Sequence, residues 1–241
     1  MLPYEKTVIL IPTYNESDNV ERMARTIFKA YPNISLLIID DGSPDGTGNI
    51  IKKIQREFPG LHLMERAKKQ GIGTAYIAGF KWALEKNYDF IFEMDCDFSH
   101  DPKDIPRLLE AAQNNDLVIG SRYIDGISIV NWPFKRLLLS YFASIYTRFI
   151  TRIPLRDTTG GFKCFTRKAL EALNFDKIIS NGYSFQLEVN YKIWGQGLKI
   201  KEVPIIFYER RDGQSKMDKN IIFEAIFAVI FLRLKKIFGT L

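Results

Sequence analysis

The sequence predicts an α/β protein whose mainly parallel sheet is covered by helices on both faces. Five short apolar segments have the length and side chains of buried strands. Segments with apolar residues at helical spacing separate these strands, and turn-forming residues follow several of them. Strands that alternate with helices in this way are typical of a parallel sheet buried on both sides.

The first elements follow this alternation. Residues 8–11 are an apolar run that we expect to form the first strand, and Pro12 ends it. Ser17 is expected to cap the first helix, whose apolar residues recur at helical spacing: Val20, Met23, Ala24, Ile27 and Phe28. A second strand is predicted over residues 36–39, and a helix follows over roughly 45–58.

The alternation continues to residue 120. Further strands are predicted over residues 61–64, 90–94 and 117–120. Helices are predicted over residues 71–86 and 102–114, between these strands. Ligands of such sheets bind beyond the carboxyl ends of the strands, so we look there for functional residues.

The chain contains no linker-like tract and no internal repeat, so we expect one catalytic domain over residues 1–220. This domain includes an amphipathic segment at 132–152. Residues 221–241 are expected to form a C-terminal amphipathic helix that contacts a membrane. A spanning helix needs about 20 apolar residues, whereas the longest apolar run near the C-terminus is 225–232. We expect the chain to lie on a membrane without crossing it.

The formal net charge of +6 suits nucleic acid, an anionic lipid surface or a phosphorylated substrate. The segment 132–152 carries basic residues among bulky apolar ones and no acidic residue, which favours lipid over nucleic acid. Cys96 and Cys164 form no CxxC motif, and no charged and apolar leader precedes the first strand. A reducing, cytosolic location is therefore expected.

Acidic residues follow two of the predicted strands. Asp40 and Asp41 come after the second strand, and Asp95 and Asp97 come after the fourth. Carboxylates at this edge suit Mg²⁺ or Mn²⁺, which commonly bridge a protein to a diphosphate. Two alternatives stay open: the first pair belongs to a tight turn, and the second is an acidic turn before a helix capped by Asp101.

Gly71 and Gly73 resemble the start of a dinucleotide-binding motif. The third glycine is missing, however, and the pair does not lie between the first strand and the first helix. We therefore expect no Rossmann cofactor site here. A close-packed start of the third helix, beside the ligand, is predicted instead.

Six motifs in order carry a family resemblance: PTYNE, DDGSPDGT, DCDFSHDP, GSRY, DTTGGF and ERRDGQSK. The set is similar to the dolichol-phosphate mannose synthases, which are inverting family 2 glycosyltransferases with the glycosyltransferase-A fold. It covers almost the whole chain. Two departures are Cys96, where the family often has Ala, and the absence of the C-terminal transmembrane helices of some relatives, so the chain resembles the short, membrane-peripheral branch.

The resemblance implies three sets of site residues. The nucleotide would be held by Pro12, Tyr14, Glu16, Ile39, Asp41, Asp95 and Cys96. A Mg²⁺ or Mn²⁺ ion would be held by Asp95, Asp97 and Ser99. Catalysis and the phosphates of donor and acceptor would be served by Asp97, Arg122, Arg136, Arg210 and Lys216.

The implied reaction is transfer of mannose from GDP-mannose to dolichyl or polyprenyl phosphate with inversion, at the cytoplasmic face of a membrane. A small membrane-anchoring subunit is a further expected partner. Three alternatives stay open: a UDP-glucose or UDP-N-acetylglucosamine donor, a non-catalytic membrane-binding subunit, and a nucleic-acid binder. The last has only the net charge in its favour.

Bulky apolar residues recur at helical spacing after residue 132: Phe134, Leu137, Leu138, Tyr141, Phe142, Ile145 and Phe149. One interpretation is an ordinary core helix. The other is an interfacial helix that rests on anionic headgroups while Arg136 reaches the acceptor phosphate.

Overall fold

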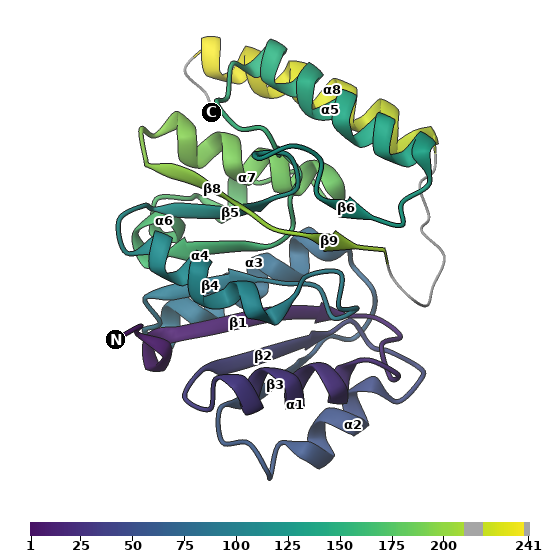
Figure 1. Cartoon of the computed structure of the whole chain (residues 1–241), viewed down its shortest axis with the longest axis vertical. Helices are drawn as coiled ribbons and strands as arrows, with labels where there is room; N and C mark the ends of the chain where they lie inside the picture. The colour runs from purple at the N-terminus through teal and green to yellow at the C-terminus, as the bar shows by residue number, and fades with distance from the viewer. Residues whose placement is uncertain (210–218, 239–241) are drawn as a thin grey trace.

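A seven-stranded sheet with strand order β3-β2-β1-β4-β7-β5-β8 runs through the computed structural model, which describes residues 1–209 and 219–238 (Figure 1). Strand β7 is antiparallel to β4 and β5, and the other neighbouring pairs are parallel. The mainly parallel sheet is thus confirmed. Its strands are β1 (Thr7–Thr13), β2 (Ser35–Asp40), β3 (Leu61–Glu65), β4 (Phe90–Glu93), β5 (Leu117–Ser121), β7 (Lys163–Thr166) and β8 (Ile200–Pro204).

Helices cover both faces of the sheet. One face carries α1 (Val20–Ala30), α2 (Thr47–Ile54) and α4 (Ile105–Ala112); the other carries α3 (Ile72–Glu85), α6 (Arg167–Glu171) and α7 (Tyr183–Gly195). Two long helices, α5 (Phe134–Thr151) and α8 (Lys219–Ile237), lie side by side beyond α7 (Figure 1). The remaining elements are the short pair β6 (Ile129–Val130) and β9 (Phe207–Tyr208) and the 3₁₀ turns η1 (Tyr4–Lys6), η2 (Pro102–Asp104) and η3 (Phe175–Lys177).

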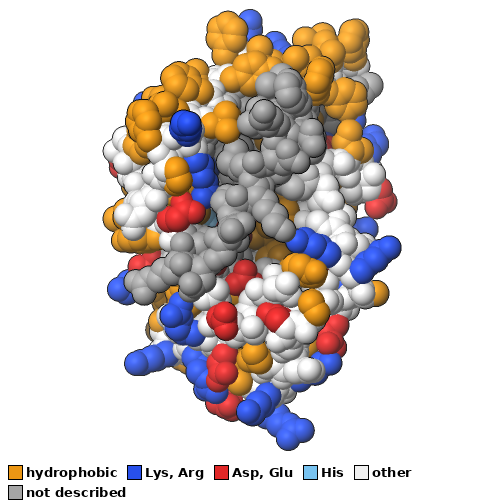
Figure 2. Space-filling view, turned by 90° about the vertical axis from the view of Figure 1, so that its right-hand side faces the viewer, with side chains coloured by type: hydrophobic (Ala, Val, Ile, Leu, Met, Phe, Trp, Pro, Cys, Tyr) orange, Lys and Arg blue, Asp and Glu red, His pale blue; other side chains and the backbone are white. Residues whose placement is uncertain are grey.

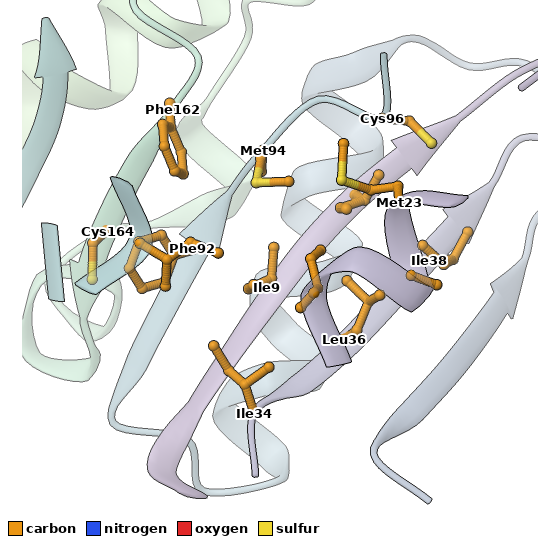
Figure 3. Packing of buried hydrophobic residues seen from close by; sticks show 14 of the residues in the cluster. Ile9, Met23, Ile34, Leu36, Ile38, Phe92, Met94, Cys96, Phe162 and Cys164 are labelled. Carbon is orange, nitrogen blue, oxygen red and sulfur yellow. The ribbon is translucent and has the colours of Figure 1, made fainter. Parts of the chain in front are cut away.

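The sheet separates two hydrophobic cores because successive strand residues point to opposite faces. Ile9 of β1 packs in the core beneath α1, α2 and α4, while Leu10 packs in the core beneath α3 and α7. Figure 3 shows the first of these cores, with Met23 of α1 lying against residues of the strands. Burial on both faces explains why the strands read as uninterrupted apolar runs.

Two local predictions were wrong. Helix α1 starts at Val20 with Asn19 at the N-cap position, so Ser17 does not cap it. The expected helix 45–58 is shorter, because α2 ends at Ile54. Conversely, Asp101 accepts a hydrogen bond from the backbone N–H of Lys103 and begins η2, as the capping pattern predicted.

The region between residues 152 and 200 was not assigned from the sequence. Strand β7 is a short segment that contains a charged residue, Lys163. Helix α7 buries polar side chains, among them Gln186, Glu188 and Asn190, which hides its buried face from a search for apolar periodicity. Neither element has the pattern by which buried strands and amphipathic helices are recognised.

Candidate active site

The polar motifs meet at the edge formed by the carboxyl ends of β1, β2, β4 and β5. The start of β7 reaches the same edge, because β7 runs in the opposite direction. Figure 2 looks onto this side of the molecule: hydrophobic side chains gather at the top of the view, and acidic and basic side chains lie below them. The edge therefore joins a charged region to an apolar one.

The turn after β4 is held by internal hydrogen bonds. Asp97 accepts two of them on Oδ1, from the backbone N–H of Ser99 at 3.0 Å and from its hydroxyl at 2.6 Å. The backbone N–H of Asp95 donates to Nδ1 of His100 at 3.2 Å. Asp97 is 9% exposed as a residue, and the side chain of Asp95 is 30% exposed. The turn thus holds the carboxylate of Asp97, and the side chain of Asp95 is the more exposed of the two.

His100 is part of this framework. Its ring lies 5.1 Å from that of Phe162 and 5.4 Å from that of Phe207, between centroids. Burial lowers the pKa of His100 to about 4, so the imidazole is neutral at physiological pH. A neutral ring that accepts at Nδ1 shapes the turn, which is a different role from that of a general base.

Asp95 and Asp97 fit a magnesium or manganese ion that takes its other ligands from a diphosphate and water, as these ions commonly do. Both supply oxygen donors of the right hardness. In residues 1–209 and 219–238, no group of three or more His, Cys, Asp and Glu side chains is placed to hold an ion. Ser99 is the third predicted metal ligand. In this structure its hydroxyl donates a hydrogen bond to Asp97, so it orients a carboxylate that was predicted to bind the same ion.

The loops after β1 and β2 are joined into one surface. The backbone N–H of Asn15 donates to the hydroxyl of Ser43 at 3.0 Å, and that of Glu16 donates to the hydroxyl of Thr47, also at 3.0 Å. Tyr14 is 38% exposed at this surface, with Nζ of Lys69 4.2 Å from its ring centroid. Tyr14 and Glu16, two of the predicted nucleotide ligands, therefore lie on a pair of loops joined by hydrogen bonds.

The two adjacent carboxylates after β2 have different partners. Asp40 accepts from the hydroxyl of Thr13 at 3.0 Å and from the backbone and hydroxyl of Ser43 at 3.0 and 2.6 Å, so it organises the turn. Asp41 lies 2.8 Å from Nη1 of Arg66 and accepts from the backbone N–H of Gln70. Arg66 was not selected from the sequence. It balances the charge of Asp41, the carboxylate predicted to meet the nucleotide.

Two predicted nucleotide contacts have buried side chains. Ile39 is fully buried and Cys96 is 3% exposed. Each belongs to the sheet or to the turn that follows it, so either would approach a ligand through its backbone. The sequence motif therefore locates these two residues near the predicted nucleotide, but it does not assign their side chains a contact with it.

Arg122 forms a buried bidentate ion pair with Asp157. Its Nε and Nη2 donate to the two carboxylate oxygens at 2.7 and 2.6 Å, and its backbone N–H donates to the same group at 3.0 Å. Burial alone would raise the pKa of Asp157, but the neighbouring guanidinium and its hydrogen bonds hold that pKa below its ordinary value. Asp157 belongs to the motif DTTGGF, but its position in that motif does not by itself predict the ion pair with Arg122.

Arg136 lies beside Arg122 on a shared aromatic side chain. The guanidinium carbon of Arg136 is 4.0 Å from the ring centroid of Trp132, and that of Arg122 is 5.7 Å from it. Arg136 also donates to Glu209 at 2.6 Å. The structure thus brings two predicted phosphate ligands together, whereas Arg210 and Lys216 lie outside the described residues.

A second buried ion pair includes Glu93, the last residue of β4, two residues before Asp95. Glu93 of β4 faces Lys163 of β7 in the strand register, with 3.7 Å between Oε2 and Nζ. Both side chains are fully buried, and Lys163 also donates to Gln186. Burial raises the pKa of Glu93 to about 7 and lowers that of Lys163 to about 8. In the sequence, a Glu within the apolar run of β4 is the feature that could have predicted a buried ion pair.

The start of α3 is closely packed, as predicted from Gly71 and Gly73. The backbone N–H of Gly73 donates to Asn181 at 3.2 Å. A Cβ atom at Gly73 would lie 2.8 Å from the ring of Phe185, which is fully buried. The glycine therefore permits a contact between α3 and α7 next to the loop that holds Asp41.

Gly73→Ala is expected to lower the free energy of unfolding by about 1–2 kcal/mol, because overpacking outweighs the gain in helix propensity. Urea unfolding followed by circular dichroism measures it. Gly48→Ala in α2 is the matched control, since the nearest atom to its Cβ is the flexible end of Glu65. Equal stability of Gly73→Ala and wild type would show that Phe185 can move aside.

The chain is similar in sequence to a known family and to named proteins. The sequence profile described as Glycosyl transferase family 2 matches residues 8–173. The polyprenol monophosphomannose synthase of Mycolicibacterium smegmatis is 41% identical over 229 residues, which cover 94% of this chain and 86% of that protein. The undecaprenyl-phosphate mannosyltransferase of Micrococcus luteus is 42% identical over 221 residues, with 92% and 91% covered.

Solved structures share the fold. A glucosyl-3-phosphoglycerate synthase from Mycobacterium tuberculosis, in complex with Mn²⁺, UDP and phosphoglyceric acid, has a TM-score of 0.69 at 16% identity and covers 95% of this chain and 78% of its own. A mannosyltransferase from Pyrobaculum calidifontis, in complex with GDP-mannose and Mn²⁺, has a TM-score of 0.59 at 16% identity, with 98% and 72% covered. The expected glycosyltransferase-A fold is confirmed, and the chain belongs to the family 2 glycosyltransferases.

Proposed function

We propose that the chain transfers mannose from GDP-mannose to a dolichyl-type polyprenyl phosphate with inversion at the sugar. The observation that carries the proposal is the meeting of a carboxylate pair, Asp95 and Asp97, with an arginine pair, Arg122 and Arg136, at one edge of the sheet. Two relatives at 41% and 42% identity, matched over 86% and 91% of their length, are named a polyprenol monophosphomannose synthase and an undecaprenyl-phosphate mannosyltransferase. Both kinds of support point to the same chemistry.

The acceptor phosphate needs no general base. Its second pKa is about 6, so it is largely dianionic at neutral pH and can attack the anomeric carbon directly. This agrees with the neutral, buried state of His100. The site must instead align two anionic ligands and offset their charges.

Each side of the site is assigned one ligand. Asp95 and Asp97 would hold the metal ion, Mg²⁺ or Mn²⁺, which when bound offsets charge on the diphosphate. Pro12, Tyr14, Glu16, Ile39, Asp41 and Cys96 would surround the nucleotide. The acceptor phosphate would lie toward Arg122 and Arg136, with Arg210 and Lys216 assigned to the phosphates by the family motif alone.

The lipid part of the acceptor is assigned to the surface of α5 and α8. Helix α5 buries small polar residues, Ser144, Thr147 and Thr151. Its large apolar side chains face outward, and Phe134, Phe142 and Phe149 are 70%, 59% and 81% exposed. A core helix has the reverse arrangement, so the interfacial interpretation is favoured. In α8, Val229 and Leu232 are buried.

Further apolar side chains of α8, and Phe238 directly after it, are exposed; those of α8 are Phe227, Ile230, Phe231, Leu234 and Ile237. They extend the exposed surface of α5, beside which α8 lies. Within the ranges 1–209 and 219–238, no helix combines the length and apolar character of a membrane span. We assign the chain a peripheral position on the cytoplasmic face of a membrane, with a small anchoring subunit as a candidate partner.

Replacing Phe134, Phe142 and Phe149 by Ser is expected to weaken vesicle binding at least tenfold. A fully buried Phe side chain contributes about 1.5–3 kcal/mol, and partial insertion of three exceeds the 1.4 kcal/mol of a tenfold change. Co-sedimentation with vesicles that contain anionic lipid measures the effect. The melting temperature should stay unchanged, because these side chains are exposed. Undiminished binding would exclude α5 as the contact.

The transfer reaction itself tests the proposed function. Purified protein is incubated with polyprenyl phosphate and radiolabelled GDP-mannose, UDP-glucose or UDP-N-acetylglucosamine, and the lipid phase is counted. Label from GDP-mannose is expected, and EDTA should abolish it. Label from a UDP-sugar alone would contradict the donor, and no label from any donor would contradict transfer activity.

A further inference from the structure

One carboxylate outside the predicted site ties together the segments that carry Arg122 and Asp157. Glu202 lies in β8, opposite Ile119 of β5 in the strand register. Its Oε1 accepts from the hydroxyl of Ser121 and from the backbone N–H of Asp157, both at 2.7 Å. Its Oε2 accepts from the backbone N–H of Arg156 at 2.7 Å. Three short hydrogen bonds therefore converge on one side chain.

These contacts fix both partners of the buried ion pair. Ser121 directly precedes Arg122, and the N–H of Asp157 belongs to the residue that binds the guanidinium. Asp157 in turn takes three hydrogen bonds from Arg122. The three described hydrogen bonds of Glu202 go to the hydroxyl of Ser121 and to the backbone of Arg156 and Asp157, so its influence on the site passes through the chain on each side of the pair.

The position of Arg122 matters because of its neighbours. Its Nη2 also donates to the hydroxyl of Thr159 at 3.0 Å, and its guanidinium shares Trp132 with Arg136. A shift of the 156–157 backbone would move Asp157, and with it the guanidinium that Asp157 holds on two oxygens. Misplacement of a binding group by about 1 Å can cost about a hundredfold in rate.

We propose that Glu202 is a positioning residue that sets the orientation of Arg122 toward the acceptor phosphate. The inference rests on the proposed function, because it assigns Arg122 to the acceptor. Neutralising Glu202 is expected to weaken acceptor binding specifically. Donor binding depends on the other half of the edge, the loops after β1, β2 and β4, none of which contacts Glu202 in the described hydrogen bonds.

Glu202→Gln is the variant of choice. The glutamine keeps the shape, but its amide NH₂ only donates, so in either orientation it faces a backbone N–H, of Arg156 or of Asp157, that loses its acceptor. Ser121→Ala is a milder second variant, since it removes one of the three donors and retains the charge. Glu110→Gln, at an exposed position on α4, is the control for the same chemical change.

The affinities for farnesyl phosphate, a short polyprenyl phosphate, and for GDP with Mn²⁺ are measured by calorimetry, and the KM values of acceptor and donor by transfer assay. Glu202→Gln should weaken farnesyl phosphate binding and raise the acceptor KM about tenfold or more, with GDP affinity and donor KM within about twofold of wild type. Ser121→Ala should show a smaller change in the same direction.

Equal farnesyl phosphate affinity in wild type, Glu202→Gln and Ser121→Ala would overturn the positioning role, as would parallel losses of donor and acceptor binding. A wild-type protein that binds GDP but not farnesyl phosphate would instead contradict the proposed acceptor, and with it the role of Glu202. If Glu202→Gln does not fold, Ser121→Ala alone decides between these outcomes.

Discussion

Asp97→Asn is expected to reduce mannosyl transfer by about 10²–10³-fold or more while leaving the fold intact. The substitution keeps the side-chain size and an oxygen that can accept from Ser99, whose hydroxyl donates to Asp97 at 2.6 Å. It removes the negative charge that would hold the metal ion against the diphosphate. Because the diphosphate carries charge away from the sugar, loss of that ion acts on the rate of transfer.

Two measurements check this prediction. Initial transfer rates are compared at saturating GDP-mannose and Mn²⁺, and Mn²⁺ binding in the presence of GDP is followed by electron paramagnetic resonance. Asp176→Asn is the matched control, since its side chain is 89% exposed and lies in η3. Near-wild-type transfer and Mn²⁺ binding in Asp97→Asn would remove Asp97 from the metal site.

Lys163→Met is expected to lower the free energy of unfolding by about 3–5 kcal/mol, because it leaves the carboxyl group of Glu93 buried without its cation. Glu93 of β4 and Lys163 of β7 are both fully buried, and Lys163 also donates to Gln186 of α7. The pKa of Glu93 is already raised to about 7 by burial. Proton uptake by Glu93 in the variant limits the cost to this range.

The double variant Glu93→Gln with Lys163→Met should recover most of that loss, since neutral groups of similar volume replace the pair. Urea unfolding of the single and double variants measures both effects. Lys168→Met, which breaks an exposed pair with Asp116, should cost less than about 1 kcal/mol. A Lys163→Met protein as stable as the Lys168→Met control would show that Glu93 and Lys163 do not depend on each other.

The helices and strands that could be predicted are those whose apolar residues form a clear run or recur at helical spacing. Strand β2 reads as an apolar run because helices cover both of its faces, and α1 shows its buried face at every third or fourth residue. Strand β7 and helix α7 could not be recognised, because Lys163 and Gln186 place polar groups where the pattern expects apolar ones. Their partners come from elements distant in the sequence, and only the folded chain brings them together.

The site, like the fold, could be predicted only in part. Strand ends locate Asp95, Asp97 and Asp41, since the carboxyl ends of parallel strands share an edge. The cations and anions that balance such residues are not visible from a strand end: Arg66 beside Asp41 and Asp157 beside Arg122 come from other segments. Which site residues contact the nucleotide, the metal and the phosphates stays a prediction for all the residues named above.

The product of the wild-type reaction tests the central claim most directly. The lipid formed from GDP-mannose and polyprenyl phosphate is extracted, and nuclear magnetic resonance determines its sugar, its linkage and its anomeric configuration. Direct attack by a phosphate on the α-linked sugar of GDP-mannose predicts a β-mannosyl phosphate. An α-linked product, or mannose attached through any group other than the lipid phosphate, would contradict the account.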